Sequence, residues 1–254
     1  MNDLNDKPYI LALDSTAVTA AAAVMKGEEI LASSVVNGVR THSETLLATA
    51  DTLIGAAGLK ISDIGLFACA AGPGSFTGVR IGVSLIKGLA YPQNKPCAGV
   101  STLEALAYNL HITARDALIV PVMDARRSQF YNALFLDRAE GRQRRLCADR
   151  VLSFDELMDD LLTVEPEKPI FFVGDGYDLA VSKLMASDYD GIKVRFCETP
   201  RLLRRQNAAS VGTVALFDMA DAKLFTHQTL APVYLRMSQA ERVRLSGSKE
   251  ENGK

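Results

Sequence analysis

Short apolar runs bounded by turn residues organise the first part of the chain. They predict strands at residues 9–13, 20–25, 29–36, 64–71 and 95–100. The alanines of the second run would also suit a helix. From Ser43 to Ala57 the apolar residues recur every three to four positions, which is typical of one face of a helix. Thr41 and Glu44 form a candidate capping box at its start. Further helices are predicted over 77–91 and 102–110.

The same order of elements returns in the second part of the chain. Strands are predicted at residues 117–123, 129–137, 144–151, 169–173 and 192–196. Helices are predicted at residues 153–162, 177–186 and 207–225, and Ser153 is the N-cap candidate of the first. Both parts follow the order β-β-β-α-β-α-β-α, and the repeat lies in this order rather than in residue identity.

Two β-meanders, each followed by α/β crossovers, predict a duplicated mixed sheet with helices on its faces. Such a duplication resembles the α/β architecture of the actin, sugar-kinase and Hsp70 (ASKHA) fold, which usually places a nucleotide in the cleft between its halves. We expect one actin-like half over residues 8–110 and a second over 111–245. The tail over 246–254 is polar and rich in Gly, Ser, Lys and Glu, so we expect it to be disordered.

Composition narrows the range of functions. The 254 residues include 28 Lys and Arg against 30 Asp and Glu, and this balance argues against a protein that wraps nucleic acid by its own charge. The four cysteines lie far apart without a C-x-x-C pair, which argues against a zinc module or a disulfide scaffold. The N-terminus resembles no export signal, and the uncharged stretches are too short or too broken to span a bilayer. We therefore expect a soluble, cytoplasmic protein without membrane association.

The most informative segment is GPGSFTGVRIG, residues 72–82, which follows a predicted strand and opens a predicted helix. Its glycines allow close backbone approach, and a helix N-terminus can hold an anion, so a phosphate cradle is one interpretation. The Gly-Lys-Ser/Thr ending of a Walker A loop is missing, and a tight turn between strand and helix is the alternative. The candidate anion contacts are Asp14, Gly74, Ser75 and Thr77.

A third interpretation of this segment concerns packing. Gly78, Gly82 and Gly88 lie in one predicted helix, where each glycine costs about 1 kcal/mol relative to alanine. Contact of the helix backbone with a neighbouring element would compensate, and Arg80 near the helix start needs an acidic or carbonyl partner. The helix would then join the 43–57 helix in a surface for another subunit. The pattern is equally consistent with two helices that cover their own sheet.

Six segments of the chain resemble the bacterial TsaB (YeaZ) family. They read ILALDST (10–16), RTHSETLL (40–47), GPGSFTGVRIG (72–82), MDARR (123–127), GDG (174–176) and PVYLR (232–236). The resemblance extends over residues 8–244, nearly the whole chain. The second and third segments together are highly specific.

The resemblance implies a role in making N6-threonylcarbamoyladenosine at position 37 of tRNAs that read ANN codons. In that family the protein is a non-catalytic scaffold or activating subunit. It pairs with TsaD, a metal- and nucleotide-binding paralogue that transfers the threonylcarbamoyl group, and works with the P-loop ATPase TsaE. It forms a homodimer when alone and reaches tRNA through the complex. No cofactor is implied for the chain by itself, and a nucleotide at the boundary with TsaD is left open.

The resemblance also implies that the two helices of the N-terminal half contact TsaD. We expect at or near that interface His42, Glu44, Leu46, Leu47, Ala50, Phe76, Val79, Arg80, Gly82 and Val83. Gly82→Arg would put a long charged side chain into a close helix contact. We expect it to abolish both the homodimer and the heterodimer.

A TsaD-type enzyme carries two histidines spaced H-x-x-x-H after its glycine-rich helix. On the resembling segment of this chain those positions are Thr102 and Leu106. Leucine cannot bind a metal, and a lone threonine hydroxyl is a poor ligand for iron or zinc. His111 lies beyond them without a histidine one turn away, which is more typical of a helix end. We therefore expect neither a metal site nor a catalytic residue.

An ATP-dependent small-molecule kinase of the same fold is the alternative function. Asp14 sits where this fold often orients a phosphate-bound metal, and Asp124 opens the second half, but Asp14 is also a common turn residue. Residues 174–176 are a weak candidate for an adenosine loop. A hydrolase is disfavoured because there is no G-x-S-x-G elbow, and adjacent His42 and Ser43 cannot form a triad by themselves.

Arginines gather at three places along the second part of the chain. A solvated surface is the simpler interpretation, and contact with the tRNA backbone in the assembled complex is the functional one. The arginines concerned are Arg142, Arg144, Arg145, Arg201, Arg204, Arg205, Arg236, Arg242 and Arg244.

Overall fold

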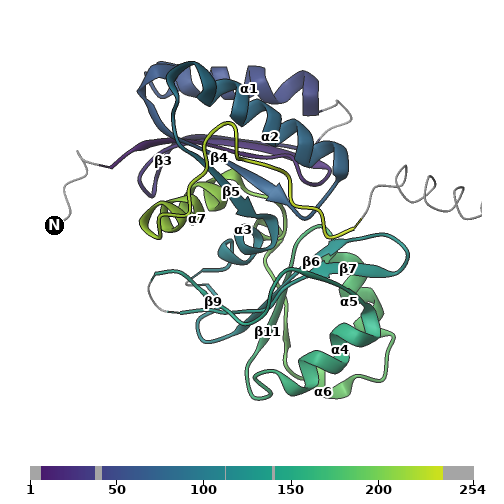
Figure 1. Cartoon of the computed structure of the whole chain (residues 1–254). Coiled ribbons are helices and arrows are strands. Elements are labelled where there is room, and N and C mark those ends of the chain that lie inside the picture. Colours follow the sequence, from purple (N-terminus) through teal and green to yellow (C-terminus); the bar gives the residue numbers. More distant parts are fainter. Residues whose placement is uncertain (1–6, 38–41, 112, 139–140, 237–254) are drawn as a thin grey trace, which may run out of the picture.

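The structure is a computed structural model that describes residues 7–37, 42–111, 113–138 and 141–236. It contains two sheets, one in each half, with helices packed against them (Figure 1). The predicted tail over 246–254, together with Arg242 and Arg244, lies outside the described residues.

The first sheet is built from the N-terminal part of the chain. Its strands run in the order β3-β2-β1-β4-β5 and are β1 (Tyr9–Asp14), β2 (Thr19–Lys26), β3 (Glu29–Asn37), β4 (Ile64–Gly72) and β5 (Cys97–Ser101). The first three strands form an antiparallel meander, and the last two continue the sheet parallel to β1. Side chains on β1 alternate between the two faces of the sheet, as in any strand. Leu11 and Leu13 join one buried cluster, and Ile10 and Ala12 join another.

Helices cover both faces of this sheet. α1 (His42–Ala56) and α2 (Phe76–Ala90) lie side by side on the face of Leu11 and Leu13 (Figure 1). α3 (Thr102–Tyr108) and α7 (Ala208–Ala220) pack on the opposite face. Short 3₁₀ turns follow α1 and α2 at Ile61–Asp63 and Tyr91–Gln93.

The second sheet has its main strands in the order β10-β7-β6-β11-β12. The strands of this half are β6 (Leu118–Asp124), β7 (Gln129–Asn132), β8 (Phe135–Leu136), β9 (Arg144–Arg145), β10 (Arg150–Ser153), β11 (Ile170–Val173) and β12 (Phe196–Cys197). β8 pairs with β6 and β9. The helices of this half are α4 (Phe154–Thr163), α5 (Tyr177–Met185) and α6 (Asp190–Lys193), and a 3₁₀ turn at Arg201–Leu203 precedes α7. Ser153 and Glu156 form the capping box of α4, which confirms the predicted N-cap.

The predicted duplicated α/β fold, with two mixed sheets and flanking helices, is confirmed. Three predicted strands were wrong in detail. The strand over 129–137 is broken into β7 and β8, with Ala133 and Leu134 between them. The strand over 144–151 is broken into β9 and β10. The run 192–196 begins as the end of α6, with Ile192 in the core, because a short apolar run suits a buried helical turn as well as a strand.

The C-terminal end of the described chain packs against the first half. α7, which we expected in the second half, buries Val211, Val214 and Ala215 against the first sheet. Beyond α7 the chain returns along α2, and Phe225 exchanges two backbone hydrogen bonds with Cys97 of β5. A boundary at residue 110 therefore separates the strands of the two sheets, but the core of the first half includes side chains from beyond that boundary.

Candidate functional site

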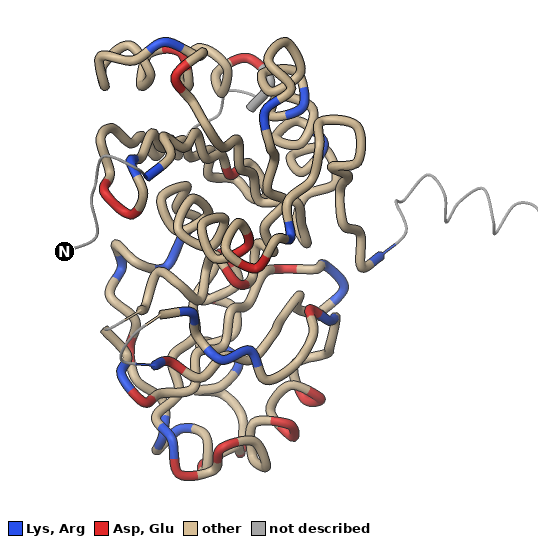
Figure 2. Tube along the Cα trace, turned by 60° about the vertical axis from the view of Figure 1, so that its left-hand side comes forward, with Lys and Arg blue, Asp and Glu red and all other residues tan. Residues whose placement is uncertain are grey.

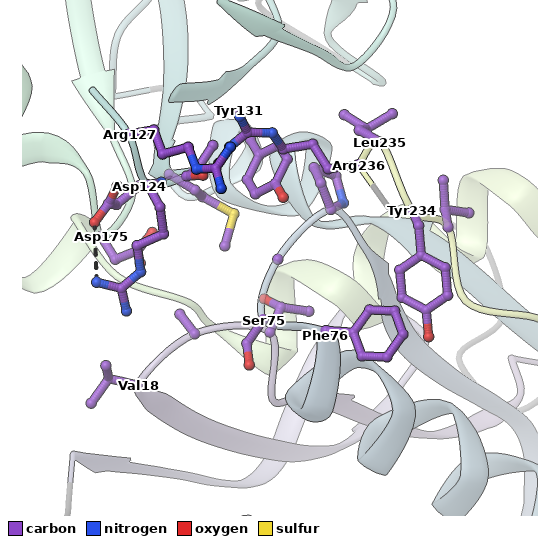
Figure 3. A pocket seen from close by; sticks show the side chains of 18 of the residues that line it. Val18, Ser75, Phe76, Asp124, Arg127, Tyr131, Asp175, Tyr234, Leu235 and Arg236 are labelled. Carbon is purple, nitrogen blue, oxygen red and sulfur yellow. Dashed lines mark hydrogen bonds and ion pairs between the residues drawn. The ribbon is translucent and has the colours of Figure 1, made fainter. Parts of the chain in front are cut away.

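A cavity of about 570 Å³ lies between the two halves. Thr16 follows β1, Pro73 follows β4, Asp124 ends β6 and Asp175 follows β11, so the carboxyl ends of strands from both sheets line it. Figure 3 shows Ser75 and Phe76 of the first half across from Asp124, Arg127 and Tyr131 of the second. The predicted cleft between the halves is present, and its chemistry depends on which groups face it.

The glycine-rich loop packs tightly against the turn that follows β1. The Ser75 amide donates a 2.7 Å hydrogen bond to the Thr16 carbonyl, and the Ser15 hydroxyl donates one of 2.8 Å to the Gly78 carbonyl. A Cβ atom on Gly78 would lie 1.9 Å from the Ser15 carbonyl oxygen, and one on Gly82 would lie 2.8 Å from the Ser15 hydroxyl. The close neighbour that these glycines predict is therefore a turn of the same chain.

The four candidate anion contacts lie in or beside this loop. One carboxylate oxygen of buried Asp14 accepts hydrogen bonds from the Thr16 amide at 2.9 Å and from its hydroxyl at 2.7 Å. Ser75 is the N-cap of α2, where its hydroxyl accepts from the Gly78 amide. Gly74 lies against Thr16, and Thr77 is exposed on the first turn. Several polar groups of the loop are thus used internally, and anion binding by these four residues stays a prediction.

The opposite wall carries an arginine-rich turn between β6 and β7 that the sequence patterns did not single out. Arg126, Arg127 and Ser128 have φ of +64°, +55° and +58°, the left-handed region that non-glycine residues rarely adopt. The Arg126 amide donates a 2.7 Å hydrogen bond to the Asp124 carboxylate. None of the three is a glycine, which is the usual signal for such backbone, so only the MDARR segment of the resemblance pointed here.

Asp175 lies in the GDG segment and lines the same cavity. The pKa of its carboxyl group is raised to about 6, chiefly by burial and also by the charge of Asp124, although a backbone hydrogen bond and the charge of Arg205 act to lower it. Its Oδ1 atom is buried without a hydrogen-bond partner in the described part of the chain. The candidate adenosine loop, residues 174–176, therefore places a carboxyl group with a raised pKa, that of Asp175, on the wall of the cleft.

The segment 231–236, which we call the strap, borders the cavity and connects the halves. The Val233 amide donates a 2.7 Å hydrogen bond to the Ala71 carbonyl. The Tyr234 ring stacks on Phe76 with 4.5 Å between centroids. Arg236 donates to the Ala125 carbonyl and to the Gln129 side chain on the arginine-rich turn. The strap thus joins the start of α2 to the wall of the second half.

The predicted interface residues divide into a buried group and an exposed group. Five of the ten predicted residues are buried within their own half, and their place at or near an interface stays a prediction. These buried residues are Leu46, Ala50, Val79, Gly82 and Val83. Their burial supports the alternative that both helices cover their own sheet. Thr41 and the side chain of His42 lie outside the described residues.

The remaining predicted residues lie on the outer side of α1 and α2. Glu44 and Arg80 are exposed, and Leu47 is 51% exposed. The Arg80 guanidinium lies 3.8 Å from the centroid of the half-buried Phe76 ring, and its Nε donates a 2.8 Å hydrogen bond to the Tyr234 hydroxyl. The partner of Arg80 is therefore an aromatic pair in its own chain rather than the acidic or carbonyl group that we expected.

The segment that resembles the metal-binding helix of TsaD is α3. Thr102 and Leu106 are both buried, and Leu106 packs in the core between the halves. His111 follows α3, stacks on Tyr108 and lies 3.0 Å from the Asp137 carboxylate, as suits a histidine at a helix end. Over the described residues, no group of three or more His, Cys, Asp and Glu side chains is arranged to hold a metal ion.

The arginine clusters are more strongly paired than a solvated surface would be. Arg142 forms ion pairs with Glu104 at 2.6 Å and with Asp218 at 3.0 Å. Arg204 pairs with Glu198 at 2.8 Å and lies over the Tyr177 ring. In Figure 2, Lys and Arg are interspersed with Asp and Glu along the trace. The surface interpretation was wrong for these two arginines, and the tRNA interpretation stays a prediction.

Comparison with known proteins places the chain among tRNA-modification proteins. The family model described as "TsaD: tRNA N6-adenosine threonylcarbamoyltransferase" matches residues 29–242. The tRNA threonylcarbamoyladenosine biosynthesis protein TsaB of Bacillus subtilis is 31% identical over 233 residues, which is 91% of this chain and 96% of that protein. The protein of the same name from Haemophilus influenzae is 32% identical over 123 residues, 48% of this chain and 51% of that protein.

Solved structures agree on the fold. YeaZ from Pseudomonas aeruginosa has a TM-score of 0.72 at 24% sequence identity, and the match covers 90% of this chain and 100% of that one. In the part of the chain that the structure describes, no helix is both long enough and apolar enough to cross a membrane.

Proposed function

The chain belongs to the TsaB (YeaZ) family of tRNA threonylcarbamoyladenosine biosynthesis proteins, and we propose that it acts there as a non-catalytic scaffold or activating subunit. In this proposal it pairs with a TsaD-type threonylcarbamoyltransferase and works with a P-loop ATPase of the TsaE type. It forms a homodimer when alone and meets tRNA through the complex. The product is N6-threonylcarbamoyladenosine at position 37 of tRNAs that read ANN codons.

The observation that carries the non-catalytic role is the state of α3. The positions of the two metal-binding histidines are held here by Thr102 and Leu106, and both side chains are buried. A leucine in the core between the halves offers no lone pair to a metal. The related transferase would therefore supply the metal and the chemistry, and this chain would supply a binding surface.

The outer face of α1 and α2 is the proposed surface for that partner. Leu47 presents an exposed apolar side chain on α1, and Arg80 presents a guanidinium on α2 that is already oriented by Phe76 and Tyr234. A shallow groove of about 370 Å³ beside α1 extends this face to Ser34 of β3. An ordered arginine beside an exposed apolar side chain supports the assignment of this face, because arginine is enriched at protein interfaces.

Docking would act on the partner by coupling rather than by chemistry. A subunit that binds one conformation of the transferase more tightly shifts it toward that conformation, and the change in affinity for tRNA or nucleotide is reciprocal. A nucleotide held at the boundary of the two proteins would fit this scheme without any cofactor site in this chain.

Reconstitution tests the proposed function. Threonylcarbamoyl transfer to tRNA is measured with this chain alone, with the TsaD-type partner and the TsaE-type ATPase, and with all three. We expect turnover only when the partner is present and a strong increase when this chain is added. Transfer by this chain alone would contradict the non-catalytic role. Turnover of ATP with a panel of sugars and acids by the chain alone would favour the kinase alternative.

The docking surface has its own test. Leu47→Asp replaces the exposed apolar side chain of this face by a carboxylate, and we expect it to weaken binding to the partner at least a hundredfold by calorimetry. Leu162→Asp is the matched control, because Leu162 is an exposed leucine on α4 of the other half, 43% exposed against 51% for Leu47. Equal affinity of the two variants would show that the partner binds elsewhere.

A further inference from the structure

The strap, residues 231–236, contacts both halves of the molecule within a very short length of chain. On the first half, the Tyr234 ring stacks on Phe76 of α2 (Figure 3). On the second half, Arg236 donates to the Ala125 carbonyl in the arginine-rich turn. Two residues of extended chain span about 7 Å at most, so the segment has little slack between these contacts. A displacement of the strap at α2 must therefore disturb its contact with the turn.

The contact on the first half reaches the proposed docking face. Arg80 is exposed on α2, and its guanidinium lies 3.8 Å from the centroid of the Phe76 ring. Its Nε atom donates a 2.8 Å hydrogen bond to the Tyr234 hydroxyl. Its two Nη atoms form neither a hydrogen bond nor an ion pair within the described residues. A partner that docks on α1 and α2 would therefore cover a residue that is bonded to the strap.

The contact on the second half is the weaker of the two. Arg236 donates to neutral acceptors, and no carboxylate pairs with it in the described part of the chain. Arg126 and Arg127 of the turn line the same cavity as Arg236, and like charges repel each other. The position of Arg236 therefore depends on how firmly the rest of the strap is held.

The strap itself buries little apolar surface. It begins directly after Leu230, which is fixed in the core of the first half. Beyond that point Val233 is 49% exposed and Tyr234 is 40% exposed. Segments with few buried contacts open locally at a small cost in free energy. The strap can thus exchange between an engaged state, with both contacts made, and a released state in which both are lost.

We propose that the strap couples the docking of a partner at Arg80 to the arginine-rich turn of the second half. This inference rests on the proposed function, since it assumes that the partner covers the outer face of α1 and α2. Tyr234 is then a positioning residue, because it acts on the partner through Arg80 and on the turn through Arg236.

Docking should favour the engaged state. A partner that covers α2 removes water from the hydrogen bond between Arg80 and Tyr234, and this bond is stronger in less polar surroundings. A carboxylate of the partner can bind the two Nη atoms of Arg80 as paired donors and hold the guanidinium in place. Because coupling is reciprocal, an engaged strap also raises the affinity for the partner.

Hydrogen–deuterium exchange of the chain alone, followed by NMR, tests the coupling. The amides of Ala125, Arg126 and Gln129 each donate a hydrogen bond within the turn, so their exchange reports opening of the turn. We expect Tyr234→Ala to speed the exchange of these amides about fivefold or more, although the ring of Tyr234 packs on the first half. Tyr234→Phe keeps the ring and loses only the bond to Arg80, so we expect a smaller increase.

Tyr91→Ala is the matched control. Tyr91 is 66% exposed at the end of α2, and its ring meets His227, which precedes the strap in the same C-terminal segment. We expect the exchange of the turn amides to change by less than about twofold in this variant. Equal exchange of the turn in Tyr91→Ala and Tyr234→Ala would overturn the proposal.

A double substitution shows whether the strap acts as one unit. Arg236→Ala removes the contact with the turn directly. If both contacts belong to one engaged state, Tyr234→Ala combined with Arg236→Ala should exchange no faster at the turn than Arg236→Ala alone. Effects that multiply would show that the two contacts act independently, and would also overturn the proposal.

Addition of the TsaD-type partner tests the direction of the coupling. At saturating partner we expect slower exchange of the turn amides in the intact chain and no slowing in Tyr234→Ala. Unchanged exchange of the turn in a complex that Leu47→Asp disrupts would contradict the coupling. A failure to form the complex at all would instead contradict the proposed function, and the exchange of the chain alone would still decide whether the strap links α2 to the turn.

Discussion

At the scale of single residues, the glycines of α2 show which positions of this helix pack against the chain itself and which are open. Gly78 and Gly82 face the turn that follows β1, where a Cβ atom would collide with Ser15. Gly88 lies in the same helix and is exposed, with no atom within 4 Å of an added Cβ. Gly82→Arg would therefore disturb the fold itself, so a loss of the dimer in that variant would not locate the interface.

A pair of alanine substitutions checks this assignment. Gly78→Ala forces the Ser15 backbone to move, and we expect it to lower the free energy of unfolding by about 3 kcal/mol. Gly88→Ala meets no obstacle and removes the entropic cost of a helical glycine, so we expect a gain of up to about 1 kcal/mol. Denaturant unfolding of both variants measures the two values. A neutral Gly78→Ala would contradict the close approach of α2 to that turn.

At the scale of elements, the hydrophobic pattern located most helices because each has a full apolar stripe and a clear start. The predicted helix at 77–91 and α2 differ by one residue at each end, and Ser75 is the N-cap of α2. The same pattern failed for the run at 192–196, where α6 and β12 together occupy too few residues for a period to appear. The spacing of apolar residues distinguishes a helix from a strand only when the element is long enough for that spacing to repeat.

The cleft was predictable from the fold, but its chemistry was not. The arginine-rich turn contains Arg-Arg-Ser where turn statistics favour Gly, Asn or Asp, so no local signal marks its left-handed backbone. The strap depends on contacts between residues far apart in sequence, such as Arg80 with Tyr234. The pairing of Arg142 with Glu104 and Asp218 likewise joins three separate elements and cannot be seen in a linear pattern.

That last group connects α3, α7 and the segment before β9, and Glu104 is its centre. The Glu104 carboxylate pairs with Arg142 at 2.6 Å and with Arg145 at 3.0 Å. Burial raises the pKa of this carboxyl group, but the two arginines outweigh burial and hold the pKa below its ordinary value. The stabilisation is therefore present above the unfolded pKa and is lost as the pH falls through the folded one.

Glu104→Ala leaves two half-buried guanidinium groups without their shared partner. We expect the free energy of unfolding at pH 7 to fall by about 2 kcal/mol, since the pairs keep some contact with solvent. Glu165→Ala is the control, because it removes the partner of the more exposed Arg144, and we expect a change within about 0.5 kcal/mol. The gap between Glu104→Ala and the unmodified chain should narrow in acid. A gap that stays constant with pH would contradict the sign of the pKa shift.

At the scale of the whole molecule, the chain is duplicated in topology but not divisible at the midpoint. α7 covers the face of the first sheet that carries Ile10 and Ala12, although it follows every strand of the second sheet. Leu230 enters the core on the other face of the first sheet. The strap then joins that sheet to the arginine-rich turn. The N-terminal half is therefore completed by the last described residues of the chain.

A rearranged chain tests this interdependence. Residues 7–110 alone would expose the apolar face that α7 covers, so we expect aggregation or a non-cooperative thermal transition by circular dichroism. Residues 207–236 joined to this fragment by a flexible linker should restore a cooperative transition, because burial of Val211 and Val214 contributes about 1.5–3 kcal/mol for each side chain. The same fusion with Val211→Asp and Val214→Asp should fail, since each substitution buries an unpaired charge. Cooperative folding of residues 7–110 without the added segment would show that the first half is complete by itself.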